Sequence, residues 1–261
     1  MISSSSKPYS KIRIAFSYLS YYFKAKKRHG VHSPFAYNFV EEVILKTRYI
    51  HYPNIEQQRR EFRKSKKVIN FTDFGKSGKT FKRKVSIIAK NSLKSPKYAK
   101  LLASALVYYK PQNVLELGTS LGITTAYMAK SSNRITTMEG DSSVVAQANQ
   151  GWDTLKISNI KTIIGNFDET LSKLDNQKFD IIYIDGNHKY EPTIRYFEYL
   201  LDNTFATTLF IFDDIHYSED MEKAWSYIKK QPNVKVTIDL FFLGFVSLDP
   251  TLTKQNHSLR Y

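Results

Sequence analysis

The sequence predicts an α/β domain built on a parallel sheet, and three observations predict it. From about residue 96 onward, short apolar runs alternate with amphipathic helical stretches. The first of these runs leads directly into a glycine-containing turn, and the fourth and fifth runs end in acidic residues. Because parallel strands need crossover connections that cover both faces of the sheet, such an alternation is typical of a sheet with helices on both sides.

The expected elements of this domain follow in order after a helix at 96–109. Strands are expected at 113–117, 134–139, 160–164, 180–184, 208–212, 234–240 and 243–248. Helices are expected near 122–131, 143–156, 168–174, 191–201 and 219–230. Almost no residues join the last two strands, so we expect these two to pair antiparallel at the edge of the sheet. The prediction is five parallel strands followed by a terminal hairpin.

Residues 1–95 are predicted to be a basic, mainly helical extension that precedes a domain over 96–261. A helix is expected over 11–28, with Ile12, Phe16, Leu19 and Phe23 on one face. We expect this apolar stripe to pack onto the rest of the protein, and an anionic membrane surface is the alternative. Further helices are expected after Ser33-Pro34, over 56–67 and over 85–93, with a loop-rich stretch at 68–84.

The composition excludes several classes of protein. The chain has 261 residues and no cysteine, which excludes disulfides, thiolate metal sites and catalysis by a cysteine nucleophile. No apolar run approaches the roughly 20 residues of a membrane-spanning helix, and the start lacks a signal-peptide core. We therefore expect a cytoplasmic protein, with peripheral attachment to the inner membrane surface as an option through the N-terminal helix.

The positive charge is concentrated in the first part of the chain. Residues 1–100 contain 24 Lys and Arg and 5 Asp and Glu, whereas residues 101–261 contain 15 and 19. The first segment thus carries a net charge of +19 and the second −4. Such a basic surface either attracts phosphates on nucleic acid, lipid or substrate, or merely keeps the protein in solution.

One motif resembles a phosphate-binding P-loop but lacks its defining residue. The stretch GKSGKT at 75–80 would need a glycine at position 73, and Asp73 stands there instead. No buried strand of the expected kind precedes it. We therefore reject a nucleoside triphosphatase.

The turn after the first strand has the composition of a nucleotide-binding turn. The strand carries Glu116 near its end and continues into Gly118-Thr119-Ser120-Leu121-Gly122 before a helix begins. Glycines let the backbone approach a ligand, and the helix start offers unpaired N–H groups. The two glycines do not fit the dinucleotide fingerprint G-x-G-x-x-G. Glu139, at the end of the second strand, is placed to accept both ribose hydroxyls of a nucleoside.

Acidic and histidine residues follow the fourth and fifth strands. The fourth strand ends in Asp185-Gly-Asn-His188, and the fifth ends in Asp213-Asp214-Ile-His216. Carboxylates gathered at one edge repel one another unless they are paired, protonated or bound to a cation. A hard divalent cation such as Mg²⁺ prefers oxygen ligands of this kind. The alternatives are a helix cap at Asp213-Asp214 and an ordinary loop histidine at His188.

These motifs together resemble those of class I, Rossmann-like methyltransferases that use S-adenosylmethionine. The pattern E-L-G-x-x-x-G resembles their first motif, which implies that Glu116 holds the amino group of the cofactor. The resemblance implies cofactor binding by Glu116, Gly118, Thr119, Ser120, Gly122, Glu139, Gly165, Asn166 and Asp185. For Gly165 and Asn166, which follow the third strand, a plain turn is the alternative.

The acidic set resembles that of metal-dependent O-methyltransferases typified by catechol O-methyltransferase. The resemblance implies a divalent cation, such as Mg²⁺, on Asp185, Asp213 and Asp214. Asp214 replaces the asparagine of that group, so the run Asp-Asp-x-His is closer to sugar O-methyltransferases, which implies that His216 is the base. His188 is a second candidate base or a substrate-binding residue.

Three functions are compatible with the sequence. The first is an O-methyltransferase for a small-molecule, sugar or glycolipid acceptor. The second is an RNA ribose methyltransferase that binds RNA through the basic segment. The third is a non-enzymatic scaffold that acts through its basic helices, against which Glu116, Glu139 and the Asp-Asp-x-His run argue.

Overall fold

The computed structural model describes residues 7–72 and 79–261, and it consists of two compact units. One unit, called unit 1, combines Met1–Asn38 with Asn176–Tyr261, and unit 2 is Phe39–Asp175. The boundary predicted between residues 95 and 96 divides the chain at a different place and stays a prediction.

Unit 2 contains three parallel strands in the order β3-β4-β5. These are β3 (Asn113–Leu117), β4 (Arg134–Glu139) and β5 (Ile160–Ile164). The helices around them are α5 (Pro96–Tyr109), α6 (Ile123–Ala129), α7 (Ser142–Thr154) and α8 (Phe167–Thr170), the last continuing into a 3-10 turn at Leu171–Leu174. All three strands begin and end as the sequence predicts.

The first part of unit 2 shares a hydrophobic core with these elements. It comprises a π-helical turn at Phe39–Ile44, a 3-10 turn at Leu45–Tyr49, α3 (Pro53–Lys64), β1 (Val68–Thr72), β2 (Thr80–Lys84) and α4 (Val85–Ser92). Ile55 and Phe62 of α3 and Ile88 of α4 are buried in one cluster with Tyr127 and Trp152. The segment before α5 therefore packs into the core of unit 2.

The expectation of a loop-rich stretch at 68–84 is wrong, because β1 and β2 pair antiparallel there. The rings of Phe71 and Phe81 face each other across the pair, with centroids 5.5 Å apart. The sequence shows no clear alternation here, because β1 (VINFT) is short and β2 (TFKRK) has a single apolar residue. The glycines of GKSGKT lie outside the described residues, but Thr80 begins a strand, whereas the P-loop hydroxyl residue begins a helix.

Unit 1 contains five strands in the order β10-β8-β9-β7-β6. They are β6 (Phe179–Ile184), β7 (Thr204–Asp213), β8 (Val236–Asp239), β9 (Leu243–Ser247) and β10 (Gln255–Ser258). β6 and β7 are parallel, and β9 pairs antiparallel with both β7 and β8, so the terminal hairpin is confirmed. Its expected edge position is wrong, because the short polar strand β10 pairs parallel with β8 beyond it.

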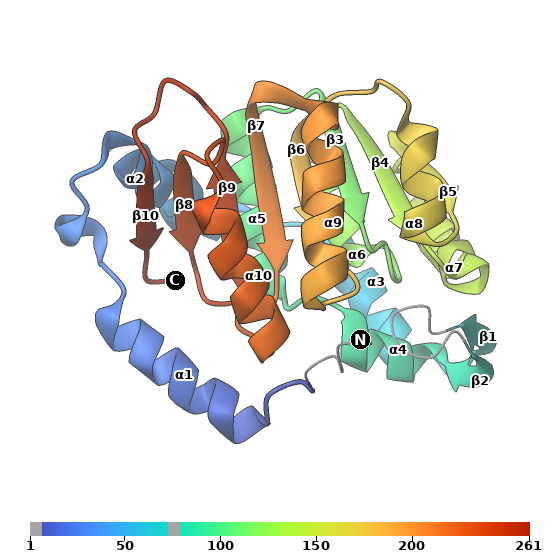
Figure 1. Cartoon of the computed structure of the whole chain (residues 1–261). Helices are drawn as coiled ribbons and strands as arrows, with labels where there is room; N and C mark the ends of the chain where they lie inside the picture. Colours follow the sequence, from blue (N-terminus) through green and yellow to red (C-terminus); the bar gives the residue numbers. More distant parts are fainter. Residues whose placement is uncertain (1–6, 73–78) are drawn as a thin grey trace. The chain divides into compact units, whose positions relative to one another are not determined.

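The helices of unit 1 are α1 (Lys11–Lys24), α2 (Pro34–Asn38), α9 (Tyr190–Leu200) and α10 (Glu219–Lys230), with 3-10 turns at Arg28–Gly30 and Leu201–Asn203. In Figure 1, α9 and α10 lie over one face of the strands. α1 contacts the residues that follow β8 and β10, through Tyr18 and Tyr21. Contrary to expectation, the apolar stripe of α1 is exposed. Among the described residues, no helix is long and apolar enough to cross a membrane.

Gly122 occupies a position that only glycine can fill without strain. Its φ of 71° lies in the left-handed region, and an added Cβ would come within 2.6 Å of the Trp152 ring. The indole N–H of Trp152 also donates to the Gly122 carbonyl oxygen at 2.9 Å. Packing against Trp152 therefore explains this glycine without a ligand.

We predict that Gly122→Ala lowers the free energy of unfolding by about 2 kcal/mol or more, because both the backbone and the indole must shift. Urea denaturation followed by circular dichroism measures the change. Gly30→Ala is the matched control, since its added Cβ would find its nearest neighbour at 3.8 Å, an ordinary contact. Equal stability of the two variants would contradict this account.

Candidate functional site

The turn after β3 folds tightly against the end of β4. Gly118 and Ser120 have positive φ angles of 106° and 47°. The N–H groups of Gly118 and Thr119 both donate to the Met138 carbonyl oxygen, at 2.9 and 3.2 Å. The hydroxyls of Thr119 and Thr137 lie 2.6 Å apart. The backbone of this turn is thus held at the carboxyl end of the strands, where the sequence predicts a ligand.

Glu116 lies within unit 2 and is fully buried. Its Oε2 accepts hydrogen bonds from the hydroxyls of Thr125 in α6 and Thr137 in β4, both at 2.6 Å. These donors satisfy Oε2 of the buried carboxylate and tie three elements together. The structure therefore shows a structural role for Glu116, and contact with the amino group of a cofactor stays a prediction.

Glu139 ends β4 beside the glycine turn, and its carboxylate is half-buried. Oε2 accepts the Ser120 N–H at 2.8 Å, and Oε1 accepts the Asp141 N–H at 3.2 Å. Burial raises the pKa of Glu139, and the hydrogen bonds from Ser120, Asp141 and Gly140 offset only part of this rise. A carboxylate has about four acceptor positions, so these three bonds still leave capacity for a ribose hydroxyl.

Gly165 and Asn166 form a turn and a helix cap after β5. The φ of Gly165 is 138°, an added Cβ would meet Thr170 at 2.8 Å, and the Gly165 N–H donates to the Glu139 carbonyl oxygen at 2.9 Å. The side-chain oxygen of Asn166 accepts the Asp168 N–H at 3.2 Å and caps α8. These contacts account for both residues, and their predicted contact with a cofactor stays a prediction.

The strand register gathers the predicted cofactor residues of unit 2 at one edge. Leu117 pairs with Met138, and Glu139 pairs with Ile164, so the three strands end at the same level. The turn Gly118–Gly122, Glu139 and Gly165 therefore follow neighbouring strand ends. This is the edge at which parallel α/β sheets bind their ligands.

Two residues that the sequence analysis missed also support this edge. Asp141 caps α7 by accepting the Val144 N–H at 2.9 Å, and its other oxygen accepts the N–H of Thr72 in β1. Ser92, at the end of α4, has its hydroxyl 2.7 Å from that of Ser120. Only Asp141 had a signal in the sequence, because Asp followed by Ser-Ser is typical of a helix cap.

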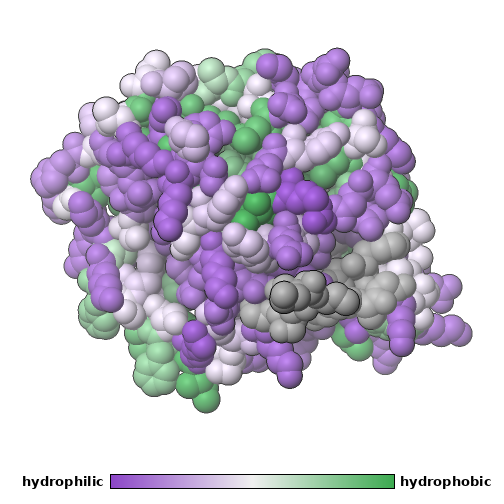
Figure 2. All heavy atoms as spheres, viewed as in Figure 1, coloured by the Kyte–Doolittle hydropathy of each residue, from purple (hydrophilic) through white to green (hydrophobic). Residues whose placement is uncertain are grey.

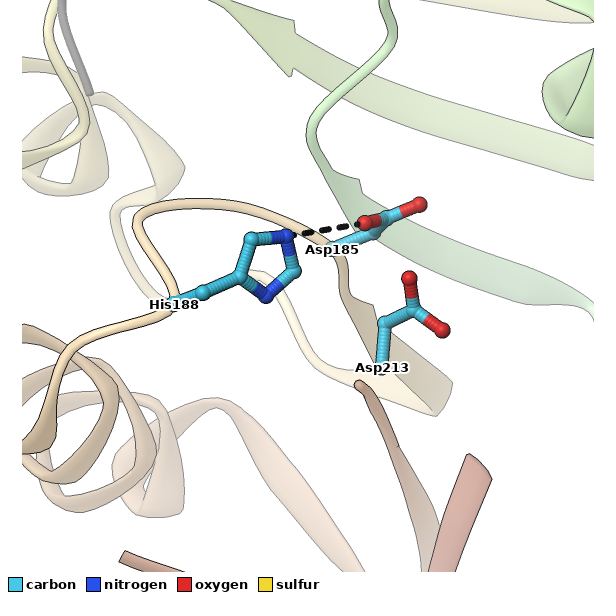
Figure 3. Close-up of side chains that lie close together, drawn as sticks. All are labelled: Asp185, His188 and Asp213. Atoms are coloured by element: carbon cyan, nitrogen blue, oxygen red, sulfur yellow. Dashed lines mark ion pairs between the residues drawn. The ribbon is translucent and has the colours of Figure 1, made fainter. Parts of the chain in front are cut away.

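In unit 1, Asp185, His188 and Asp213 point toward one another (Figure 3). Asp185 follows β6, His188 lies in the loop before α9, and Asp213 ends β7, where it is buried. His188 Nε2 lies 3.5 Å from Asp185 Oδ1, and the Tyr183 hydroxyl donates to Asp185 Oδ2 at 2.9 Å. One ligand atom from each of the three residues lies within 4.8 Å of the others, so this group has the spacing of a metal site.

Asp214 does not belong to this group within the described residues. Its φ of 54° is left-handed, so the backbone leaves the direction of β7 at this residue. Its N–H donates to the Phe242 carbonyl oxygen at 2.7 Å, and its carbonyl oxygen accepts the Tyr217 N–H at 2.9 Å. The structure thus brings His188 to the place that the sequence analysis gave to Asp214.

His216 is engaged elsewhere in unit 1 by two carboxylates. Its Nε2 lies 2.9 Å from Asp239 Oδ2 and its Nδ1 lies 3.3 Å from Glu222 Oε1, while the ring stacks on Phe241. Burial by itself lowers the pKa of His216, but the hydrogen bond and charge of Asp239, followed by those of Glu222, raise it above its ordinary value. These contacts engage both ring nitrogens and are suited to hold α10 against the end of β8, and the predicted role of His216 as the base stays a prediction.

We predict that the free energy of unfolding declines as pH rises above about 6.5, because a raised histidine pKa stabilises the fold fully only below its unfolded value. His216→Gln should flatten this decline, which urea denaturation between about pH 6 and about pH 9 measures. His257→Gln is the control, since burial and Lys26 lower the pKa of His257 and its contribution has the opposite sign. If the free energy of unfolding of His216→Gln declined with pH at the same slope as that of the wild type, the contacts of His216 with Asp239 and Glu222 would not be responsible.

Comparison with known proteins places these residues in a family context. Residues 115–215 match the model of a protein family described as "Methyltransferase domain". The matched range includes Glu116, Glu139, Asp185 and Asp213 and ends one residue before His216. No curated protein matches this chain.

Solved structures share the fold at low sequence identity. An O-methyltransferase from Bacillus cereus, in complex with SAH, superposes with a TM-score of 0.57 at 18% identity, covering 80% of this chain and 96% of the other. The methyltransferase PaMTH1 of Podospora anserina, bound to SAH, gives 0.59 at 14% identity, covering 83% and 98%. The O-methyltransferase TomG of Streptomyces achromogenes, which is involved in tomaymycin synthesis and was solved with SAM, gives 0.58 at 14% identity, covering 79% and 94%.

The Rossmann-like α/β fold predicted from the sequence is therefore confirmed. The matched range begins in β3 and ends just after β7, which is the part of the chain that carries the predicted motifs. Residues 115–215 are thus similar to a methyltransferase domain, in agreement with the predicted resemblance to the class I, S-adenosylmethionine-dependent methyltransferases.

Proposed function

We propose that this chain transfers the methyl group of S-adenosylmethionine to a hydroxyl oxygen of a small-molecule, sugar or glycolipid acceptor. The observation that carries the proposal is Glu139, a carboxylate at the end of β4 that accepts the N–H groups of Ser120 in the glycine turn and of Asp141. Two of the structures that share the fold are O-methyltransferases, solved with SAH and with SAM. This likeness supports both the cofactor and the acceptor atom.

In this proposal, the carboxylate of Glu139 accepts hydrogen bonds from the two ribose hydroxyls of the cofactor. The Ser120 and Asp141 N–H groups fix the orientation of the carboxylate before any ligand binds. Hydrogen bonds to a charged acceptor contribute about twice as much as neutral ones, so this residue should account for a large share of the affinity. The turn Gly118–Gly122 lies beside the same carboxylate and lets the backbone approach the cofactor.

We predict that Glu139→Gln weakens the binding of S-adenosylmethionine about tenfold or more, because the amide loses one acceptor oxygen and the negative charge. Isothermal titration calorimetry measures the dissociation constant. Asp153→Asn is the matched control, since it removes one carboxylate charge from an exposed position of α7 in the same unit. An unchanged dissociation constant for Glu139→Gln would remove this residue from the cofactor site.

A divalent cation fits the group formed by Asp185, His188 and Asp213. Two carboxylates and one imidazole suit Mn²⁺, Fe²⁺, Co²⁺ or Zn²⁺, and the carboxylates also suit Mg²⁺. We propose that these three residues hold such a cation, with His188 in the place first assigned to Asp214. When bound, a cation lowers the pKa of a hydroxyl group that it coordinates. The Tyr183 hydroxyl orients Asp185 for this role by its hydrogen bond.

In this proposal His216 positions the site and does not act as the base. Its contacts with Asp239 and Glu222 hold the segment after β7 in place, between the end of β8 and α10. If transfer proceeds without a cation, His188 is the base instead, because Asp185 lies beside its ring and orients it. A chelator distinguishes the two mechanisms, because it should stop methyl transfer that needs the cation and leave transfer with His188 as the base unchanged.

RNA ribose methylation is the second candidate, and one observation favours it. Several basic side chains of α3 and β2 are exposed: Arg60, Arg63, Lys64, Lys82 and Lys84. An exposed basic face of this kind binds phosphates in a salt-dependent manner. The identity of the acceptor distinguishes the two candidates directly.

The test is transfer of a labelled methyl group from S-adenosylmethionine into a fractionated cell extract, with added Mg²⁺ or Mn²⁺ and with chelator. We predict that the label enters the small-molecule or lipid fraction, that chelator abolishes transfer and that Asp213→Asn lowers it by about 10²-fold or more. Asp202→Asn is the control, since it removes a carboxylate from an exposed 3-10 turn of the same unit.

Each outcome of this experiment is informative. Label in the RNA fraction would replace the proposed acceptor with the second candidate. Transfer that resists chelator would remove the cation and leave His188 as the base. Absence of both transfer and cofactor binding would contradict the proposed function as a whole.

A further inference from the structure

Helix α1 faces the rest of unit 1 with its tyrosines. The rings of Tyr18 and Tyr21 lie 5.2 and 5.4 Å from that of Phe241. The Tyr18 hydroxyl donates to the Tyr261 carbonyl oxygen at 3.3 Å, and the Tyr21 hydroxyl donates to that of Leu259. Directly after the helix, the Lys26 N–H donates to the Ser258 carbonyl oxygen at 2.8 Å. These contacts fix which face of α1 points outward.

The outward face of α1 is apolar. Ile12, Phe16, Leu19 and Phe23 are 71%, 69%, 50% and 78% exposed. Their spacing of four, three and four residues places them in one stripe along the helix. In Figure 2, hydrophobic side chains gather at the lower left, where Figure 1 places α1. A helix that stabilised its own protein through its apolar face would turn that face toward the protein. In α1 the apolar stripe points outward instead, so it is available to a partner.

The charge around this stripe indicates the kind of partner. Residues 7–28 contain seven basic residues and no acidic ones. All seven are exposed: Lys7, Lys11, Arg13, Lys24, Lys26, Lys27 and Arg28. A second copy of the chain would bring two such clusters together, and their repulsion disfavours that occupant. Anionic lipid headgroups attract juxtaposed lysines and arginines, while the acyl chains below them accept apolar side chains.

We propose that α1 is an interfacial helix that binds an anionic membrane surface. Ile12, Phe16, Leu19 and Phe23 enter the boundary between headgroups and acyl chains, and the flanking basic residues contact the headgroups. With its 14 residues, α1 is about 20 Å long and lies in the membrane plane. This inference is independent of the methyl transfer proposed above.

The test is sedimentation of the full-length protein with vesicles. One set contains phosphatidylcholine and phosphatidylglycerol in equal parts, and the other contains phosphatidylcholine alone. We predict binding to the anionic vesicles that weakens with added salt, and a decrease of about tenfold or more in partitioning for the double variant Phe16→Ser with Phe23→Ser. The matched control is Tyr199→Ser with Phe205→Ser, which alters two side chains of unit 1 that are 47% and 41% exposed and lie outside α1.

Circular dichroism checks that both double variants remain folded, as their exposed positions predict. The proposal is overturned if the wild type ignores anionic vesicles at low salt, or if it binds neutral and anionic vesicles equally. It is also overturned if the control loses binding to the same extent. Dimerisation that depends on Phe16 and Phe23, without binding to vesicles, would assign the stripe to a second copy of the chain.

Discussion

Carboxylates placed at the ends of buried strands require compensation, and this constraint shapes the described site. A carboxylate without donors or a cation is costly in such surroundings. Within unit 2, Glu116 is compensated by the hydroxyls of Thr125 and Thr137, which join β3, β4 and α6. Glu139 is compensated by the backbone N–H groups of Ser120, Asp141 and Gly140, which also fix its direction. The same bonds that make these acids tolerable therefore set the shape of the turn beside them.

In unit 1, carboxylates at the strand ends are compensated in two different ways. One arrangement involves His216 and the other involves His188. His216 lies between Asp239 of β8 and Glu222 of α10, and these carboxylates favour the protonated form of its ring. His188 lies beside Asp185 in a partly exposed loop, with Asp213 and the ring of Tyr217 nearby. The first arrangement favours a fixed, protonated ring and the second leaves ligand atoms for a cation. The proposal therefore gives the chemistry in unit 1 to His188, which follows β6.

Much of the architecture could be predicted from the sequence because the parallel strands are short, apolar and separated by amphipathic helices. The five strands β3 to β7 and the hairpin of β8 and β9 were found this way. The pair β1 and β2 is not evident in the sequence because β1 is short and β2 has a single apolar residue, and β10 is not evident because its residues are polar. The positions of Glu139, Asp185 and Asp213 at strand ends were predictable. The exchange of Asp214 for His188 was not, because it depends on the left-handed backbone at Asp214, which sequence spacing does not reveal.

The central claim is that the carboxyl ends of these strands bind the reactants, with Glu139 on the nucleoside and Asp185, His188 and Asp213 on a cation. A crystal structure of the full chain grown with S-adenosylhomocysteine and Mn²⁺ tests it most directly. The account predicts ribose hydroxyls within hydrogen-bond distance of the Glu139 carboxylate and an anomalous peak among the three cation ligands. A nucleoside bound away from Glu139, with no peak at those residues, would contradict it.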